Sequence, residues 1–115
     1  MNLGGLTTLG RYRPGNLVHV IFDNESLLSV GGFPTATSTG TSLAAMARAA
    51  GIPRTAEVAT LEAFVSAFAA ARASGALTTI VAKVDATGPS VFVTDLGLLE
   101  NRFQFQRYLA SRDAP

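Results

Sequence analysis

The stretch LVHVIFDNESLLSVGGFPT, residues 17–35, joins an apolar run to an acid–amide pair and a glycine-containing segment. Its first six residues are apolar except for one histidine, which is typical of a strand buried on both faces of a parallel sheet. Asp23 and Asn24 follow directly. Because open α/β sheets bind ligands at the carboxyl ends of their strands, this stretch predicts oxygen ligands at such an edge.

Helix and strand patterns alternate along the rest of the chain. Leucines three residues apart predict a first helix, although glycines weaken it. Residues 24–40 indicate a structureless loop, which at that length is usually functional or mobile. The alternation predicts one α/β domain over residues 1–115, a three-layer sandwich with a mainly parallel sheet and helices on both faces. The expected helices cover residues 2–12, 42–50, 61–74 and a segment after Thr94, and the further strands cover 55–59 and 77–84.

Capping residues mark the ends of these helices. Thr41 or Ser42 is the expected N-cap of the second helix, Thr60 that of the third and Thr94 that of the last. Gly51 and Gly75 are expected just beyond two helix ends, where a left-handed backbone conformation favours glycine.

Composition excludes several classes of function. The 115 residues are 48% hydrophobic and 15% charged, with a mean hydropathy of +0.32, so part of the apolar surface is expected to face a partner. A net charge of +1 predicts neither a nucleic-acid nor a membrane partner. The chain has no cysteine and no apolar run near the ~18 residues of a membrane span. These features fit a cytoplasmic protein.

The residues around Asp23 and Asn24 suit a hard cation. Carboxylate, amide and carbonyl oxygens are the ligands of magnesium, which is usually completed by substrate phosphates. The alternative is that the pair only caps a turn. Glu25 either faces this loop or is an exposed turn charge, and Asp85 either lines the same edge or caps a turn. His19, alone within an apolar strand, is expected to be structural.

Several segments together resemble the diphosphate-binding domain of thiamine diphosphate-dependent decarboxylases, particularly phosphonopyruvate and sulfopyruvate decarboxylases. The residues that carry the likeness are LGGL at 3–6, Asn24, the glycines and Pro-Thr within 31–35, the helix at 42–51, and the tail at 92–95 and 100–103. In that family a Gly-Asp-Gly, an Asn and a backbone carbonyl two residues later hold magnesium, which holds the cofactor diphosphate. The resemblance therefore implies magnesium ligands at Asn24 and the Ser26 carbonyl. It also implies cofactor binding by Asn24, Glu25 and Ser26, with thiamine diphosphate and Mg²⁺ as cofactors.

This chain departs from the family pattern in three ways. The Gly-Asp-Gly, and with it the charged metal ligand, would fall before Met1. Leu27, Leu28 and Phe33 stand where the family usually has an aromatic, a glycine and a glutamine. No second, pyrimidine-binding domain is present in the sequence.

We therefore expect a thiamine diphosphate-binding domain of the 2-oxo acid decarboxylase (lyase) type that is not active alone and carries no catalytic residue. Its expected partner is a pyrimidine-binding domain or subunit in a homo- or hetero-oligomer. One alternative is a non-catalytic interaction module that retains the fold. Another is that the protein continues upstream of Met1.

Overall fold

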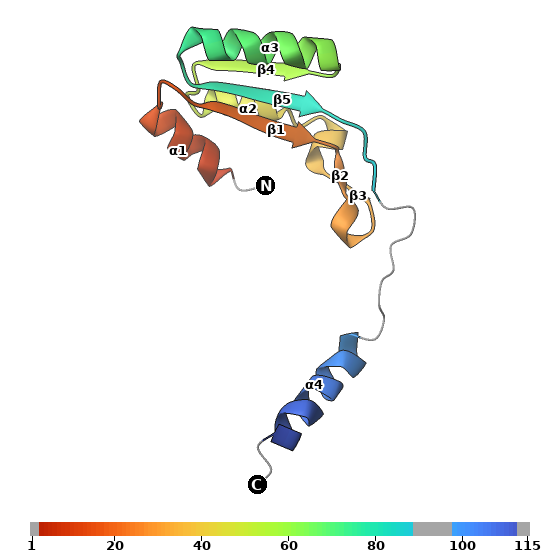
Figure 1. Ribbon diagram of the computed structural model, residues 1–115. Helices are drawn as coiled ribbons and strands as arrows, with labels where there is room; N and C mark the ends of the chain where they lie inside the picture. Colours follow the sequence, from red (N-terminus) through yellow and green to blue (C-terminus); the bar gives the residue numbers. More distant parts are fainter. Residues whose placement is uncertain (1–2, 89–97, 113–115) are drawn as a thin grey trace.

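The computed structural model describes residues 3–88 and 98–112 and contains the expected succession of elements (Figure 1). It is an α/β structure with a parallel sheet, as predicted, and the strand and helix bounds agree with the expected ones to within a few residues. Thr94 and residues 92–95 lie outside the described residues. The elements are α1 (Gly4–Tyr12), β1 (Val18–Asp23), β2 (Ser26–Leu27), β3 (Phe33–Pro34), α2 (Leu43–Ala49), β4 (Arg54–Val58), α3 (Leu61–Ser74), β5 (Thr78–Lys83) and α4 (Leu98–Arg112).

The main sheet has the strand order β1–β5–β4, and both pairings are parallel. The central strand, β5, is buried along almost its whole length. The prediction that the strand at residues 17–22 is buried on both faces is wrong. Among the described residues β1 has a single neighbour, β5, so it is an edge strand, and the Phe22 side chain is 69% exposed.

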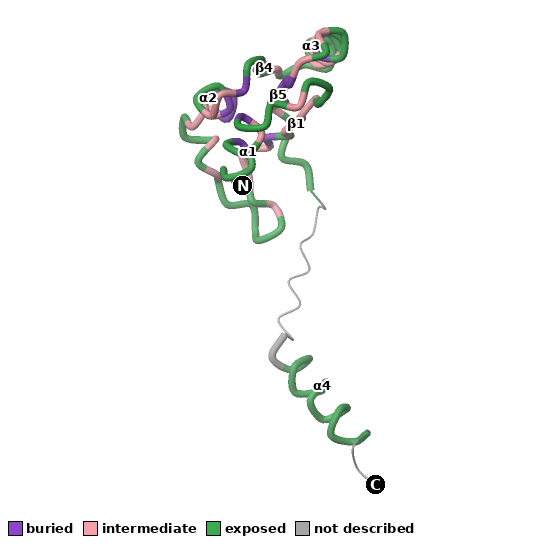
Figure 2. Tube along the Cα trace, turned by 90° about the vertical axis from the view of Figure 1, so that its left-hand side faces the viewer, coloured by how far each residue is buried: buried purple, intermediate pink, exposed green. Residues whose placement is uncertain are grey.

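Helices pack on both faces of this sheet. On one face, Leu43 and Ala44 of α2 contact Val81 of β5. The helix α1 joins the same layer through a second buried cluster, which consists of Leu6, Ala47, Ile52 and Leu77. On the other face lies α3, where the Phe64 ring is 6.3 Å from that of Phe22. Figure 2 shows that the buried residues concentrate where these layers meet the sheet.

The predicted caps of α2 and α3 are present. The Ser42 hydroxyl, not that of Thr41, accepts a hydrogen bond from the Ala45 N–H at 3.1 Å. Thr60 accepts in the same way from the Ala63 N–H at 3.2 Å. Each helix thereby satisfies one of the N–H groups that have no partner inside its first turn.

Residues 24–40 are not the structureless loop that the composition suggests. They form a small antiparallel pair, β2 with β3, and two short 3-10 turns at Leu28–Val30 and Ala36–Thr39. Gly31 and Gly32, with φ angles of 110° and 79°, make the tight reversal between the two strands possible. The segment therefore returns to the carboxyl edge of the main sheet with its backbone partly paired.

The helix α4 forms as predicted, but its described apolar side chains are not part of the core. Phe103, Phe105, Tyr108 and Leu109 are all exposed. In Figure 1 this helix lies apart from the sheet.

Two glycines of α1 provide a matched test of this packing. A Cβ at Gly10 would lie 1.8 Å from the Ala50 carbonyl oxygen, whereas a Cβ at Gly5 would meet nothing within 4 Å. We expect Gly10→Ala to separate α1 from α2 and to lower the free energy of unfolding by about 2 kcal/mol or more. Gly5→Ala should be neutral or stabilising by up to about 1 kcal/mol. Urea denaturation of both variants measures the difference, and equal stabilities would contradict this packing.

Candidate functional site

The candidate site lies at the carboxyl edge of the main sheet, where β1 and β5 end side by side. The parallel register places Asp23, the last residue of β1, opposite Lys83, the last residue of β5. The chain continues from β1 into Asn24, Glu25 and Ser26, so the polar residues that follow the strand stay at this edge. Asn24, Glu25 and Ser26, which the sequence predicts as site residues, therefore lie together, and Lys83, sixty positions after Asp23, lies beside them.

Lys83, the only lysine of the sequence, bridges two carboxylates. Its Nζ lies 2.8 Å from Oδ2 of Asp23 and 2.6 Å from Oε1 of Glu25. The Asp23 side chain is 7% exposed, and its Oδ1 also accepts bonds from the Thr37 hydroxyl at 2.7 Å and the Glu25 N–H at 3.1 Å. Glu25 is thus a turn charge with 43% of its side chain exposed, and it is paired with Lys83.

These contacts shift both pKa values in the direction that favours the ion pair. Burial by itself raises the pKa of Asp23, but the hydrogen bonds from Lys83, Thr37 and the Glu25 N–H, with the charge of Lys83, outweigh it. The pKa of Asp23 therefore lies below its ordinary value of 3.8. The hydrogen bonds to Asp23 and then Glu25 raise the pKa of Lys83 well above its usual range. The pair is fully charged at neutral pH.

Asn24 and Ser26 are joined by a hydrogen bond. The Asn24 side-chain oxygen accepts a hydrogen bond from the Ser26 N–H at 3.1 Å, which is the geometry of an Asx turn. Between them Glu25 has a φ of 55°, in the left-handed region that non-glycine residues seldom adopt. The turn-capping role that the sequence left open for Asp23 and Asn24 is therefore present in the structure, and a ligand role for Asn24 stays a prediction.

A cavity of about 340 Å³ opens beside these residues. It lies between the start of α1, the end of β1 and the segment before α2, and threonines of that segment contribute to its wall. Its lining includes Leu3, Asn24, Thr35, Thr37 and Thr41. Its volume falls within the range of small-ligand sites, about 300–1,000 Å³.

Sequence reasoning missed two participants, Lys83 and Thr37. Lys83 is a single charge at the end of an apolar strand, and Thr37 is one of several threonines in a loop. The only available signal was that β5, like β1, ends at the ligand-binding edge of a parallel sheet. That reasoning singled out Asp85 instead, whose side chain is exposed.

The donor set by itself does not fit a magnesium ion. The two carboxylates nearest to Asn24 are both bonded to the Lys83 ammonium, and the Asn24 oxygen is bonded to the Ser26 N–H. Among the described residues there is no cluster of three or more His, Cys, Asp or Glu that could hold a metal ion. Magnesium is usually bound through one or two carboxylates together with phosphate oxygens, and a site of that kind would need a further charged ligand here.

His19 has a structural setting, as expected. Its Nδ1 lies 3.3 Å from the Thr79 hydroxyl of the neighbouring strand, on the face of the sheet that α1 covers. No helix in the described part of the chain is long and apolar enough to cross a membrane.

Comparison with known proteins identifies no relative of this chain. No protein-family model matches the chain, and neither the curated proteins nor the solved structures contain a significant match.

The ion-pair network predicts how stability depends on pH. Because the pKa of Asp23 is lower in the folded protein, its contribution is present above the unfolded pKa of about 3.9 and is lost as pH falls through the folded value. The pKa of Lys83 is raised, so its contribution is present at neutral pH and is lost only in strongly alkaline solution. We expect Lys83→Met to lower the free energy of unfolding by about 1–3 kcal/mol at neutral pH.

Urea denaturation from neutral to acidic pH measures this effect. The difference in the free energy of unfolding between wild type and Lys83→Met should shrink from about pH 4 downward, because the Asp23 carboxylate becomes protonated. Arg72→Met, which removes an exposed positive charge from α3, is the control and should change stability by less than about 0.5 kcal/mol. A gap that persists unchanged in acid would show that the effect of the substitution is not due to the ion pairs.

Proposed function

We propose that this chain is a diphosphate-binding domain of the thiamine diphosphate-dependent decarboxylase type, with the truncated three-layer fold of that family. In this proposal the chain holds one part of the cofactor site and is not active by itself. The observation that carries the proposal is the position of Asn24. It lies at the carboxyl end of a parallel strand, in the wall of a cavity of ligand size.

The arrangement around Asn24 supports this proposal. The order of strand β1, turn and residues 31–40 is the order expected from the family resemblance. Asn24, Glu25 and Ser26 lie at the sheet edge where α/β proteins bind ligands. The Thr41 hydroxyl, in the wall of the cavity, is a suitable hydrogen-bond donor to phosphate oxygens, whereas the Thr37 hydroxyl donates to Asp23 and the Thr35 hydroxyl is bonded to Thr37. In this proposal the Asn24 side chain and the Ser26 carbonyl are magnesium ligands, and Glu25 lies beside the cofactor.

In this proposal the site is completed by a partner. Lys83 neutralises one of the two negative charges of Asp23 and Glu25, and both carboxylates are committed to it. In this proposal the charged ligand and the pyrimidine-binding surface come from outside the described residues. A pyrimidine-binding domain or subunit, in a homo- or hetero-oligomer, is the proposed partner.

Calorimetry tests cofactor binding directly. Thiamine diphosphate titrated into the chain should give weak, millimolar binding in the presence of Mg²⁺ and none in EDTA, because two neutral oxygens hold the ion poorly. Asn24→Ala should abolish the signal. Asn24→Asp retains an acceptor for the Ser26 N–H and adds a charged ligand, so it should bind at least as tightly as wild type.

Gln104→Ala, on α4, is the control for these titrations and should bind as wild type does. Circular dichroism on each variant separates a lost ligand from a lost fold. Absence of any heat at millimolar cofactor, or binding that Asn24→Ala leaves unchanged, would refute the proposed site.

Catalysis provides a second test. The purified chain, supplied with thiamine diphosphate and Mg²⁺, should release no carbon dioxide from sulfopyruvate, phosphonopyruvate or pyruvate, because the proposed site lacks its charged ligand and its partner domain. A coupled assay or a ¹³C-labelled substrate measures this. Robust turnover by the chain alone would show that the site is already complete.

A second candidate, a non-catalytic interaction module, is favoured by the apolar surface on the α3 side of the sheet. Phe22, Leu61 and Val65 are all more than half exposed. In this alternative the ion pairs of Lys83 with Asp23 and Glu25 only stabilise the carboxyl ends of β1 and β5. The titration above distinguishes the two, since an interaction module gives no heat with the cofactor.

A further inference from the structure

The strand β4 has an open edge, because among the described residues it pairs only with β5. The N–H groups of Thr78 and Val84 donate to carbonyls at β1, so the even-numbered residues of β5 face β1 and the odd-numbered ones face β4. Since Thr79 lies opposite Thr55, its main-chain groups bond to the residues on either side of Thr55. The N–H and C=O groups of Thr55 and Glu57 therefore point to the open edge.

Two opposite charges lie beside these main-chain groups. Arg48 of α2 donates from its Nε to the Thr55 hydroxyl at 2.6 Å, and the Ser42 hydroxyl donates to Oε2 of Glu57 at 3.4 Å. Arg48 and Glu57 are both exposed and lie on the face of the sheet that α2 covers. Within the described part of the chain the ion pairs are those of Lys83, so neither of these two charges is neutralised.

A second copy of β4, placed antiparallel on this edge, fits in one register. Residues whose main-chain groups face each other form the hydrogen-bonded pairs of an antiparallel ladder. Pairing Thr55 of each copy with Glu57 of the other satisfies all of these groups, with Ala56 on the two-fold axis. A shift in one direction would place Pro53, which has no N–H, opposite Glu57. A shift in the other direction would place the two Glu57 carboxylates opposite each other.

The same register brings the unpaired charges together across the edge. Directly opposed side chains have their Cβ atoms about 4.5–5.5 Å apart. Glu57 of the second copy would therefore lie beside Thr55, and so beside the Arg48 guanidinium that is bonded to Thr55. The two-fold axis repeats this contact at the other end of the strand pair. Charged residues usually keep edge strands from pairing, but here the antiparallel arrangement sets each charge against its opposite.

The α3 face of this edge has room for the side chains of a second copy. A cavity of about 440 Å³ lies beside β4, and its α3 wall consists of the small residues Ala67, Ala70 and Ala71. On this face Arg54 would lie opposite Val58 of the second copy, so that no two like charges oppose each other. The register is therefore compatible with both faces of the sheet.

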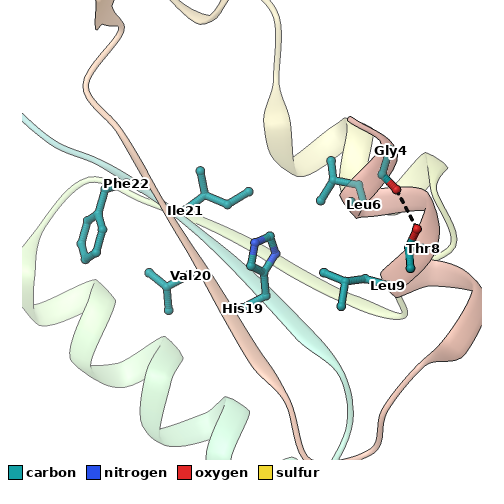
Figure 3. A pocket seen from close by; sticks show the side chains of 9 residues that line it. Gly4, Leu6, Thr8, Leu9, His19, Val20, Ile21 and Phe22 are labelled. Atoms are coloured by element: carbon teal, nitrogen blue, oxygen red, sulfur yellow. Dashed lines mark hydrogen bonds between the residues drawn. The ribbon is translucent and has the colours of Figure 1, made fainter. Parts of the chain in front are cut away.

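The other open edge of the sheet, that of β1, offers no comparable selection. A groove of about 860 Å³ lies between β1 and α1. Figure 3 shows its walls, where His19 and Ile21 extend toward Leu6 and Leu9 of α1. The residues that line this groove include no Asp, Glu, Lys or Arg. Charge complementarity therefore favours a particular partner, direction and register at β4 and not at β1.

We infer that β4 pairs antiparallel with β4 of a second copy of this chain, about a two-fold axis at Ala56. The pairing joins the two sheets into one and forms an Arg48–Glu57 ion pair at each end of the contact. Because the same surface of both copies is used, the assembly closes at two chains. The inference does not require the proposed cofactor, since β5 separates β4 from the strand that carries Asn24.

Charge exchange tests the ion pairs in the full chain. Analytical ultracentrifugation at low salt, from micromolar to millimolar protein, should show a reversible monomer–dimer equilibrium. Arg48→Glu and Glu57→Arg each place like charges across both contacts, so each should raise the dissociation constant at least about tenfold. The double variant restores opposite charges in exchanged positions, and its dissociation constant should return to within about threefold of wild type.

Arg72→Glu and Glu62→Arg are the controls for these measurements. Both residues are exposed on α3, and the substitutions make the same changes in net charge away from the β4 edge. They should dimerise as wild type does, and circular dichroism on every variant checks the fold. A chain that stays monomeric throughout would overturn the inference. A dimer that either single reversal leaves intact, or that the double variant does not restore, would overturn it equally.

Disulfide cross-linking tests the strand pairing without changing a charge. The sequence has no cysteine, so Ala56→Cys introduces a single thiol at the proposed axis. In this register the two Cα atoms at position 56 belong to a non-hydrogen-bonded pair about 4.5 Å apart, a separation that a disulfide spans. Mild oxidation of the full chain should therefore give a covalent dimer on a non-reducing gel.

Val20→Cys, in the middle of β1, and Ala45→Cys, exposed on α2, are the matched controls and should remain mainly monomeric. Glu57→Arg introduced into the Ala56→Cys chain should slow cross-linking at least about tenfold, in parallel with its effect on dimerisation. Absence of a covalent dimer from a folded Ala56→Cys chain would overturn the inference. Equal cross-linking through Val20→Cys would assign the contact to the β1 edge and would also overturn it.

Discussion

The pairing of β1 with β5 is the constraint on which the rest of the structure depends. It joins residues sixty positions apart in register, from Val18 opposite Thr78 to Asp23 opposite Lys83. β5 then takes the buried centre of the sheet, and β1 and β4 become its edges. Closing so long a loop costs conformational entropy, which is recovered only when the apolar faces of β5 are covered by helices on both sides. Sheet register and helix packing are therefore parts of one cooperative arrangement.

The same register creates the charge network at the carboxyl edge. A buried carboxylate such as Asp23 is costly unless it is paired and hydrogen-bonded. Here the cost is offset by Lys83, Thr37 and the Glu25 N–H together. The same contacts stabilise the turn after β1. The backbone of Glu25 is in the left-handed region, and its carboxylate accepts a hydrogen bond from Lys83. The site is thus a pre-organised turn whose negative charge is already partly neutralised.

The elements of the fold could be predicted from the sequence because their signals are local. Periodic apolar positions, Ser42 and Thr60 as caps, and Gly51 and Gly75 after helices are all read within a few residues. The edge position of β1 could not be predicted, since it depends on which strand lies between β1 and β4. The composition of β1 resembles that of a central strand, and only the pairing with β5 shows that one side is open.

The candidate site divides in the same way. Asn24, Glu25 and Ser26 are adjacent in sequence, so a strand that ends at Asp23 brings them to the sheet edge without further information. Lys83 reaches them only through the strand order, and no feature near Lys83 signals this. The returning segment was misjudged for a different reason. Its many Gly, Ser and Thr residues are typical of an irregular loop, whereas Gly31 and Gly32 allow the reversal between β2 and β3.

The end of β1 and the start of α1 meet at the cavity beside Asn24. Asn24 follows β1, the cavity beside it begins at Leu3, and Leu3 directly precedes α1. The packing of α1 against α2, through Leu6 and Ala47, therefore also fixes one wall of the cavity beside Asn24.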